Sequence, residues 1–126
     1  MFSHVMVGAN DIEAATKFYD ATLGVLGIAP GTRDDHGRVF YRTPAGAFAI
    51  TKPINGEPAL GANGGTIGFA ASTPEQIEAW HAAGLASGGT TCEDPPGPRG
   101  AGKLHLAYLR DPAGNKLCIL YRMPPR

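Results

Sequence analysis

Three side chains in this 126-residue chain could take part in acid–base or nucleophilic chemistry: His4, Tyr108 and Cys118. His4 lies in an alternating segment, residues 3–8, that is typical of a short strand. An imidazole titrates near pH ~6.5, so His4 can act as a general base or donate a hydrogen bond to a ligand oxygen. A strand histidine bonded to a neighbouring carbonyl explains the same residue equally well.

Tyr108 and Cys118 flank a turn at residues 111–115, so a hairpin centred there pairs them and points both to one face. A phenol at that position suits stacking or donation to a ligand oxygen, and a packed aromatic ring is the equal alternative. Cys118 is better explained as a small buried filler than as a reactive thiolate. Leu117 and Ile119 take the opposite face.

Four further positions are candidates for ligand binding. Arg42, at a strand end, and Arg99, in the turn-rich loop 93–103, could bind a carboxylate or phosphate, although solvated arginines are the simpler explanation. The same loop could close over a site as a lid. Thr66 could hydrogen-bond a ligand, and Ala49 is small enough to leave room beside it.

The elements that position these residues form a unit that occurs twice. In the first copy, Asn10 and Glu13 predict the start of a helix over residues 11–23, and two strands, 38–42 and 47–51, form a hairpin. In the second copy, strand 66–71 precedes a helix capped by Thr73, with Pro74 and Gln76 completing the signature.

A shift of 62 residues carries His4 to Thr66, Phe18 to Trp80 and Leu23 to Leu85. Such a repeat indicates a duplicated supersecondary unit that reads strand, helix, strand, strand, strand. We predict modules at residues 1–57 and 64–126 in one domain, with a Gly/Pro-rich linker between them. If the helix covers one face of each sheet, the two sheets can curve around a shared concavity.

Composition excludes several partners. The 11 basic and 11 acidic residues balance, which argues against a nucleic-acid or anionic-membrane partner. No apolar run approaches the ~18–20 residues that cross a bilayer. The first residues lack the pattern of a signal peptide, and two cysteines are too few for a disulfide framework. We therefore expect a reduced, cytoplasmic protein.

The duplicated unit, the opening residues 4–7, the Phe18-Tyr19 pair and the closing Asp-Pro-Ala-Gly-Asn turn at 111–115 resemble the vicinal oxygen chelate superfamily. Its members include glyoxalases, extradiol dioxygenases, methylmalonyl-CoA epimerase, and fosfomycin- and bleomycin-resistance proteins. The resemblance covers residues 2–121. It implies an α+β fold in which tandem βαβββ modules form a cup-shaped mixed sheet, a divalent metal in the cup, a small-molecule ligand and a homodimer.

The family's metal ligands, usually His or Glu, come from the first and last strands of each module. His4 matches one such position, whereas the others fall on Thr66, on Cys118 and on Ala49 or Ile50. A metal site needs about three protein donors. The resemblance and these departures together predict a protein without the family-type metal centre and with no other cofactor.

Several functions remain open at this stage. The chain could bind a small molecule in the cup without a metal, or sequester an antibiotic-type molecule without catalysis. It could be a lyase, isomerase or dioxygenase in which His4 and Tyr108 supply acid–base groups, or one that uses an atypical metal site around His4. A dimeric scaffold without a ligand is the remaining alternative.

Overall fold

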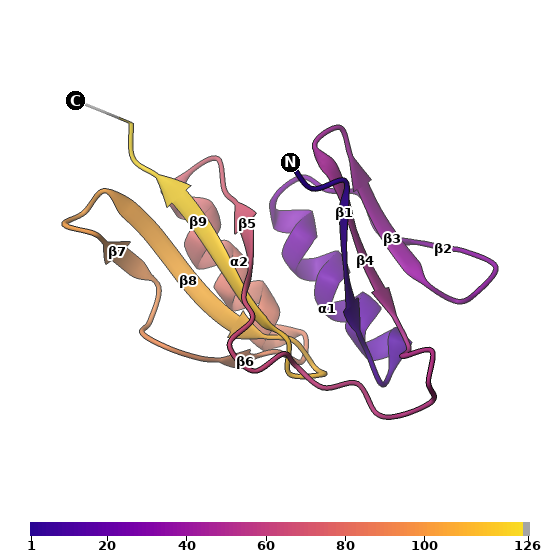
Figure 1. Cartoon of the computed structure of the whole chain (residues 1–126). Helices are drawn as coiled ribbons and strands as arrows, with labels where there is room; N and C mark the ends of the chain where they lie inside the picture. Colours follow the sequence, from indigo (N-terminus) through magenta and orange to yellow (C-terminus); the bar gives the residue numbers. More distant parts are fainter. Residues whose placement is uncertain (125–126) are drawn as a thin grey trace.

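The first module contains one helix and a four-stranded sheet. A computed structural model describes residues 1–124, so Pro125 and Arg126, at the end of the second predicted module, lie outside the described residues. The order is β1 (His4–Gly8), α1 (Ile12–Val25), β2 (Thr32–Arg33), β3 (Val39–Thr43) and β4 (Gly46–Thr51). The strands lie side by side as β1-β4-β3-β2, with β1 parallel to β4 and the other neighbours antiparallel (Figure 1).

The second module repeats this order. It comprises β5 (Ile67–Ala70), α2 (Pro74–Ala86), β6 (Thr90–Thr91), β8 (Leu104–Arg110) and β9 (Lys116–Arg122), and its strands lie as β5-β9-β8-β6. The turn-rich loop holds one extra short strand, β7 (Gly97–Arg99), which pairs with β8. The predicted fold class, α+β with two βαβββ units and mixed sheets, is confirmed.

The two helix starts test the capping predictions. Thr73 caps α2 as predicted, because its side chain accepts a hydrogen bond from the Gln76 amide. For α1 the predicted cap, Asn10, is wrong: Asp11 accepts the amide of Ala14 instead. The Asn10 side chain forms two hydrogen bonds with the backbone of Ala59 in the linker, at 2.6 and 3.1 Å. Either residue type can cap a helix, and the long-range contact decided between them.

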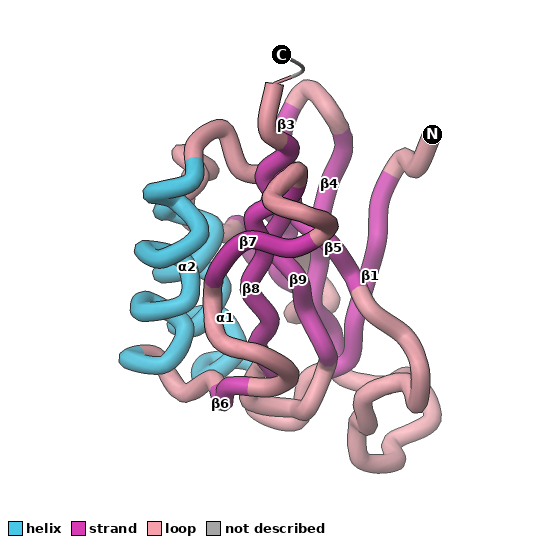
Figure 2. Tube along the Cα trace, turned by 90° about the vertical axis from the view of Figure 1, so that its left-hand side faces the viewer, coloured by secondary structure: helices cyan, strands magenta, loops and turns pink. Residues whose placement is uncertain are grey.

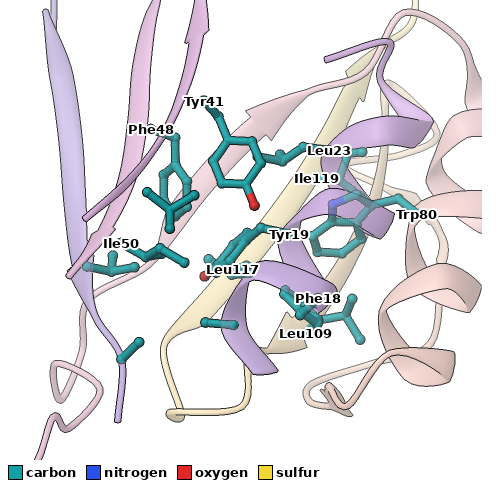
Figure 3. Packing of buried hydrophobic residues seen from close by; sticks show 14 of the residues in the cluster. Phe18, Tyr19, Leu23, Tyr41, Phe48, Ile50, Trp80, Leu109, Leu117 and Ile119 are labelled. Carbon is teal, nitrogen blue, oxygen red and sulfur yellow. The ribbon is translucent and has the colours of Figure 1, made fainter. Parts of the chain in front are cut away.

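One core joins the modules, and both helices belong to it. In Figure 2 the helices lie to one side of the strands, and Figure 3 shows Tyr19 and Leu23 of α1 between side chains of the two sheets. The Phe48 and Phe69 rings, one from each sheet, lie 5.3 Å apart in an edge-on arrangement. The faces of the two sheets that look towards each other are therefore filled by α1, α2 and apolar side chains.

The helices approach closely because α2 carries a glycine where they meet. A Cβ atom on Gly84 would lie 2.2 Å from a methyl group of Leu109 and 3.2 Å from the Phe18 ring. A side chain at position 84 would therefore force the Leu109 side chain to move and would crowd the Phe18 ring. Gly84 thus allows α1 to pack against both α2 and the second sheet.

A buried hydrogen-bond network also joins the modules. The Tyr19 hydroxyl of α1 donates to Asp111 Oδ2 at 2.5 Å, and Asn115 Nδ2 donates to the same oxygen at 2.8 Å. Asn115 Nδ2 also donates to the carbonyl of Gly8 at 2.9 Å. The turn that closes the second module is therefore bound to α1 and to the end of β1.

Burial and the neighbouring Asp111 raise the pKa of Tyr19 well above its ordinary value of 10.0. The unfolded chain therefore releases the Tyr19 proton at a lower pH than the folded chain. We expect the free energy of unfolding to fall as the pH rises above about 10, with a limiting slope of about 1.4 kcal/mol per pH unit for this residue. Urea unfolding between pH 8 and 11 measures the slope.

Tyr19→Phe should be less stable than the wild type at pH 8 and should lose stability less steeply above pH 10. Burial also raises the pKa of Tyr41, whose hydroxyl donates to Asp20. Tyr41 should therefore also contribute to the loss of stability above pH 10, and Tyr41→Phe measures that contribution. Equal slopes in the wild type and both variants would contradict the assignment.

Candidate functional site

The side chains predicted to form a site lie on the faces of the two sheets that point away from the helices. Successive strand residues alternate between faces. Because the alternate residues Val7, Phe48 and Ile50 are buried in the shared core, their strand neighbours face outwards. We call the outer face of the first sheet face A; it consists of His4, Met6, Phe40, Arg42, Ala47 and Ala49.

On face A, His4 and Arg42 lie on either side of Ala47, with which both are in register. His4 is exposed, and its Nδ1 lies 2.8 Å from the Ser3 hydroxyl oxygen. The Arg42 guanidinium stacks over the Phe40 ring at 4.4 Å and donates to the Thr32 hydroxyl at 3.3 Å. Face A therefore presents an imidazole and a positioned guanidinium to solvent.

Ala49 lies deeper on the same face, in register with Met6 and Phe40. It has no exposed surface, so its neighbours cover the space that the small side chain was predicted to leave. In one chain, the open part of face A is the end that carries His4, Ala47 and Arg42.

The outer face of the second sheet, which we call face B, carries Gly68, Leu106, Tyr108, Lys116 and Cys118, and the register adds Ala70, Leu104, Arg110, Leu120 and Arg122 to it. Tyr108 is in register with Cys118, which confirms the predicted pairing and shared face. Gly68 is in register with Cys118 on its other side, and a Cβ added to Gly68 would meet no atom within 4 Å. Face B therefore has an open position beside the thiol.

The protonation states on face B follow from its environment. Burial raises the pKa of the Cys118 thiol from its ordinary 9.0, so it is a neutral thiol at physiological pH. Burial, with neighbouring Cys118 and Glu93, also raises the pKa of Tyr108, so its phenol keeps its proton and can donate it in a hydrogen bond. The Lys116 ammonium lies 5.1 Å from the Tyr108 ring centre and pairs with Glu93.

The sequence reasoning did not single out Lys116, Glu93 or Gly68. Lys116 and Gly68 become recognisable only from the register of β9, which brings Lys116 and Cys118 onto one face and sets Gly68 beside Cys118. Glu93 comes from the loop that precedes β7, and no local pattern predicts that its carboxylate reaches Lys116. The available signal was the two-residue spacing of Lys116 and Cys118 along one strand, which puts both on the same face.

Two other predicted residues lie away from these groups. The Arg99 guanidinium donates to the backbone carbonyls of its own loop, at residues 94, 95, 97 and 98, over distances of 2.8 to 3.3 Å. These bonds use most of its donors, so Arg99 organises the loop that holds β7. Thr66 is exposed and lies one residue before β5.

The structure does not bring His4 and Tyr108 together within one chain. His4 is on face A and Tyr108 on face B, and the common core of helices and apolar side chains separates the two faces. The sequence argument placed one concavity between the two modules of a single chain. The structure fills the angle between the sheets with both helices, so faces A and B point in different directions (Figure 1).

The separation of the two faces also limits which side chains could bind a metal ion together. Among residues 1–124, no three or more His, Cys, Asp or Glu side chains gather into a possible metal site. His4 and Cys118, the two matching positions with a donor atom, lie on different faces. A face-A-to-face-B contact would add the Tyr108 phenol, which holds its proton, and the Glu93 carboxylate, which is paired with Lys116. The donor set does not fit the family's divalent metal.

Comparisons with known proteins give one consistent result. The family model described as "Glyoxalase/Bleomycin resistance protein/Dioxygenase superfamily" matches residues 1–119. A glyoxalase/bleomycin resistance protein from Albidiferax ferrireducens is 67% identical, with a TM-score of 0.93 over 97% of this chain and 99% of that chain. No relative is found among the curated proteins.

Two more distant solved structures share the fold. A glyoxalase-related enzyme from Fulvimarina pelagi is 19% identical, with a TM-score of 0.77 over 97% of this chain and 88% of that one. A lactoylglutathione lyase from Agrobacterium tumefaciens is 22% identical, with a TM-score of 0.66 over 96% of this chain and 92% of its own. Among the described residues, no helix combines the length and the apolar character that a membrane span requires.

Proposed function

The chain belongs to the glyoxalase/bleomycin resistance protein/dioxygenase superfamily, and on that premise we propose that it binds a small molecule in a cup shared by two copies of the chain. Face A of one copy supplies His4 and Arg42, and face B of the other supplies Tyr108 and Cys118. The single observation that carries this proposal is the separation of these groups within one chain. Two copies related by a two-fold axis can form two such cups.

The exposed groups define what the cup would recognise. Arg42 offers a guanidinium for an anionic group, and its stacking on Phe40 reduces the entropy lost when it binds. The protonated Tyr108 phenol can donate to a ligand oxygen. Met6 is exposed and adds apolar surface, whereas Leu106 and Cys118 are almost completely covered, so a ligand with an apolar body and a carboxylate or phenolate group fits this arrangement.

Catalysis on the bound molecule is the second candidate function. It is favoured by one observation: face A carries an exposed imidazole, and face B carries a phenol that keeps its proton. In such a cup His4 would accept a proton from the substrate while Tyr108 donates one to a developing oxyanion. Sequestration without turnover uses the same groups for binding only. The free cysteines, Cys92 and Cys118, suit a cytoplasmic site of action for either function.

The metal prediction has a direct test. We expect untagged protein to contain far less than one transition-metal ion per chain, and added Zn²⁺, Ni²⁺, Mn²⁺ or Fe²⁺ to leave its melting temperature nearly unchanged. The physical reason is the shortage of donors, since two matching donors fall below the three of a typical open metal site. Elemental analysis and thermal unfolding with each metal provide the measurements. One ion per chain that His4→Ala removes would overturn the metal-free proposal.

The cup itself is tested by oligomeric state and ligand screening. Sedimentation should show a dimer, and a thermal-shift screen of aromatic carboxylates and phenols should yield ligands whose effect disappears in Arg42→Ala and Tyr108→Ala. Arg33→Ala is the matched control for charge, because Arg33 is an exposed arginine of β2 that is in register with Val39, a residue of the face opposite to face A. A monomer that still binds these ligands through Tyr108 alone would contradict the shared cup.

A further inference from the structure

A cavity of about 430 Å³ that is open to solvent on one side lies between the modules. Its apolar lining includes Leu26, Ile28, Tyr41, Phe48, Ile67 and Phe69, and the cavity also reaches His4 and Ala47 of face A and Gly68 of face B. The residues at its mouth are the first four of the chain. Of the side chains predicted to form a site, only His4 and its neighbour Ala47 touch it.

The hydrophobic side chains around this cavity are incompletely packed. Val5, Leu26, Ile28, Ile67 and Phe69 are only partly buried, although each packs against the fully buried core. Close packing normally removes such gaps, because each lining atom loses its dispersion partners. A cavity of about 150 Å³ with a lining of this kind is large enough for benzene. The space here is nearly three times as large.

The polar groups of the wall are already hydrogen-bonded. The Tyr41 hydroxyl donates to Asp20 Oδ1 at 2.8 Å. The Thr43 hydroxyl donates to the Gly46 carbonyl at 2.9 Å and accepts the Ala45 amide at 3.1 Å. A buried water needs two to four polar partners, and these hydroxyls have little capacity left for one. The wall therefore offers few free hydrogen-bonding groups, which suits an apolar ligand.

We propose that this cavity is a second binding site, which adjoins the cup and shares His4 with it, and that it takes a small, flat apolar molecule of one or two rings. The rings of Tyr41, Phe48 and Phe69 provide aromatic surface for stacking, and the aliphatic side chains close the remaining sides. At the mouth, the Ser3 hydroxyl and the His4 imidazole can bind one polar substituent. A ligand with a single hydrogen-bonding group on an apolar ring matches this arrangement.

Indole and p-xylene are suitable probes, since one carries a single N–H donor and the other has no polar group. Methyl NMR spectra of labelled protein should show saturable shifts at Ile28 and Ile67. The signals of the Ile54 methyl groups should not shift, because Ile54 is an exposed residue after β4 that does not line the cavity. Indole should bind more tightly than p-xylene because of the polar mouth. Shifts that fail to saturate, or that affect Ile54 equally, would show that the cavity holds no ligand site.

Two cavity-filling variants, Ile28→Phe and Val5→Phe, place a ring inside the space. Each should raise the melting temperature and weaken indole binding at least tenfold, and the second protects the test if the first does not fold. Leu85→Phe enlarges an exposed side chain of α2 in the same way and should leave indole binding unchanged. Tyr108→Ala alters only the cup, so it should retain indole binding even if the cup proposal fails. Unweakened indole binding in both filled variants would refute the site.

Discussion

Asp111→Ala is expected to lower the free energy of unfolding by about 3 kcal/mol or more. The Asp111 carboxylate is almost completely buried and accepts hydrogen bonds from the Tyr19 hydroxyl, the Asn115 side chain and the amides of Ala113 and Asn115. A hydrogen bond to a charged group contributes about 1.5–3 kcal/mol, and each buried donor left without a partner costs about 1–3 kcal/mol. Alanine removes all of these bonds at once and leaves the Tyr19 hydroxyl buried without its acceptor.

Urea unfolding at neutral pH measures this loss. Asp35→Ala is the matched control, because Asp35 is exposed at the tip of a hairpin, and it should change stability by less than about 0.5 kcal/mol. Tyr19→Phe removes one bond of the network and should cost less than Asp111→Ala. If Asp111→Ala lost under 1 kcal/mol, the network would not be holding the modules together.

The turn around Asp111 shows how much of the structure the sequence repeat can predict. In the first module Thr43 occupies the corresponding position, and its hydroxyl accepts the Ala45 amide just as Asp111 Oδ1 accepts that of Ala113. The shared Pro-Ala-Gly pattern predicts this local turn in both places. The second carboxylate oxygen of Asp111, which binds Tyr19, makes a contact across 92 positions of the chain, and no local pattern indicates it.

The arrangement of the modules could not be predicted from the sequence either, because it also depends on contacts between distant residues. Strand alternation correctly assigns Leu117, Ile119, Phe48 and Ile50 to one kind of face, and all four are buried. Alternation does not say whether two such faces meet each other or lie apart. That choice depends on the fit at Gly84, where the absence of a side chain lets α1 pack against α2 and Leu109. The sequence therefore predicts which residues of a strand share a face, but it does not predict the direction in which faces A and B point.

The separation of the two faces leads to the prediction with the largest functional effect. His4→Ala and Tyr108→Ala, each tested alone, should weaken binding of a cup ligand by roughly tenfold to a hundredfold, since each removes a hydrogen bond worth about 1.5–3 kcal/mol to a charged ligand group. In a mixed dimer of the two variants, one cup combines the intact His4 of one chain with the intact Tyr108 of the other. We expect that dimer to bind ligand with wild-type affinity at half the wild-type stoichiometry.

Calorimetric titration of differently tagged, co-purified chains measures both quantities. The matched control is a mixed dimer of His4→Ala and Arg42→Ala. Both substitutions lie on face A, so each of its two cups lacks one of these residues and affinity should not recover. Recovery in the first mixture alone requires that one cup draws on both chains. Without recovery in either mixture, His4 and Tyr108 cannot act on one ligand, because the core of each chain keeps their two faces apart.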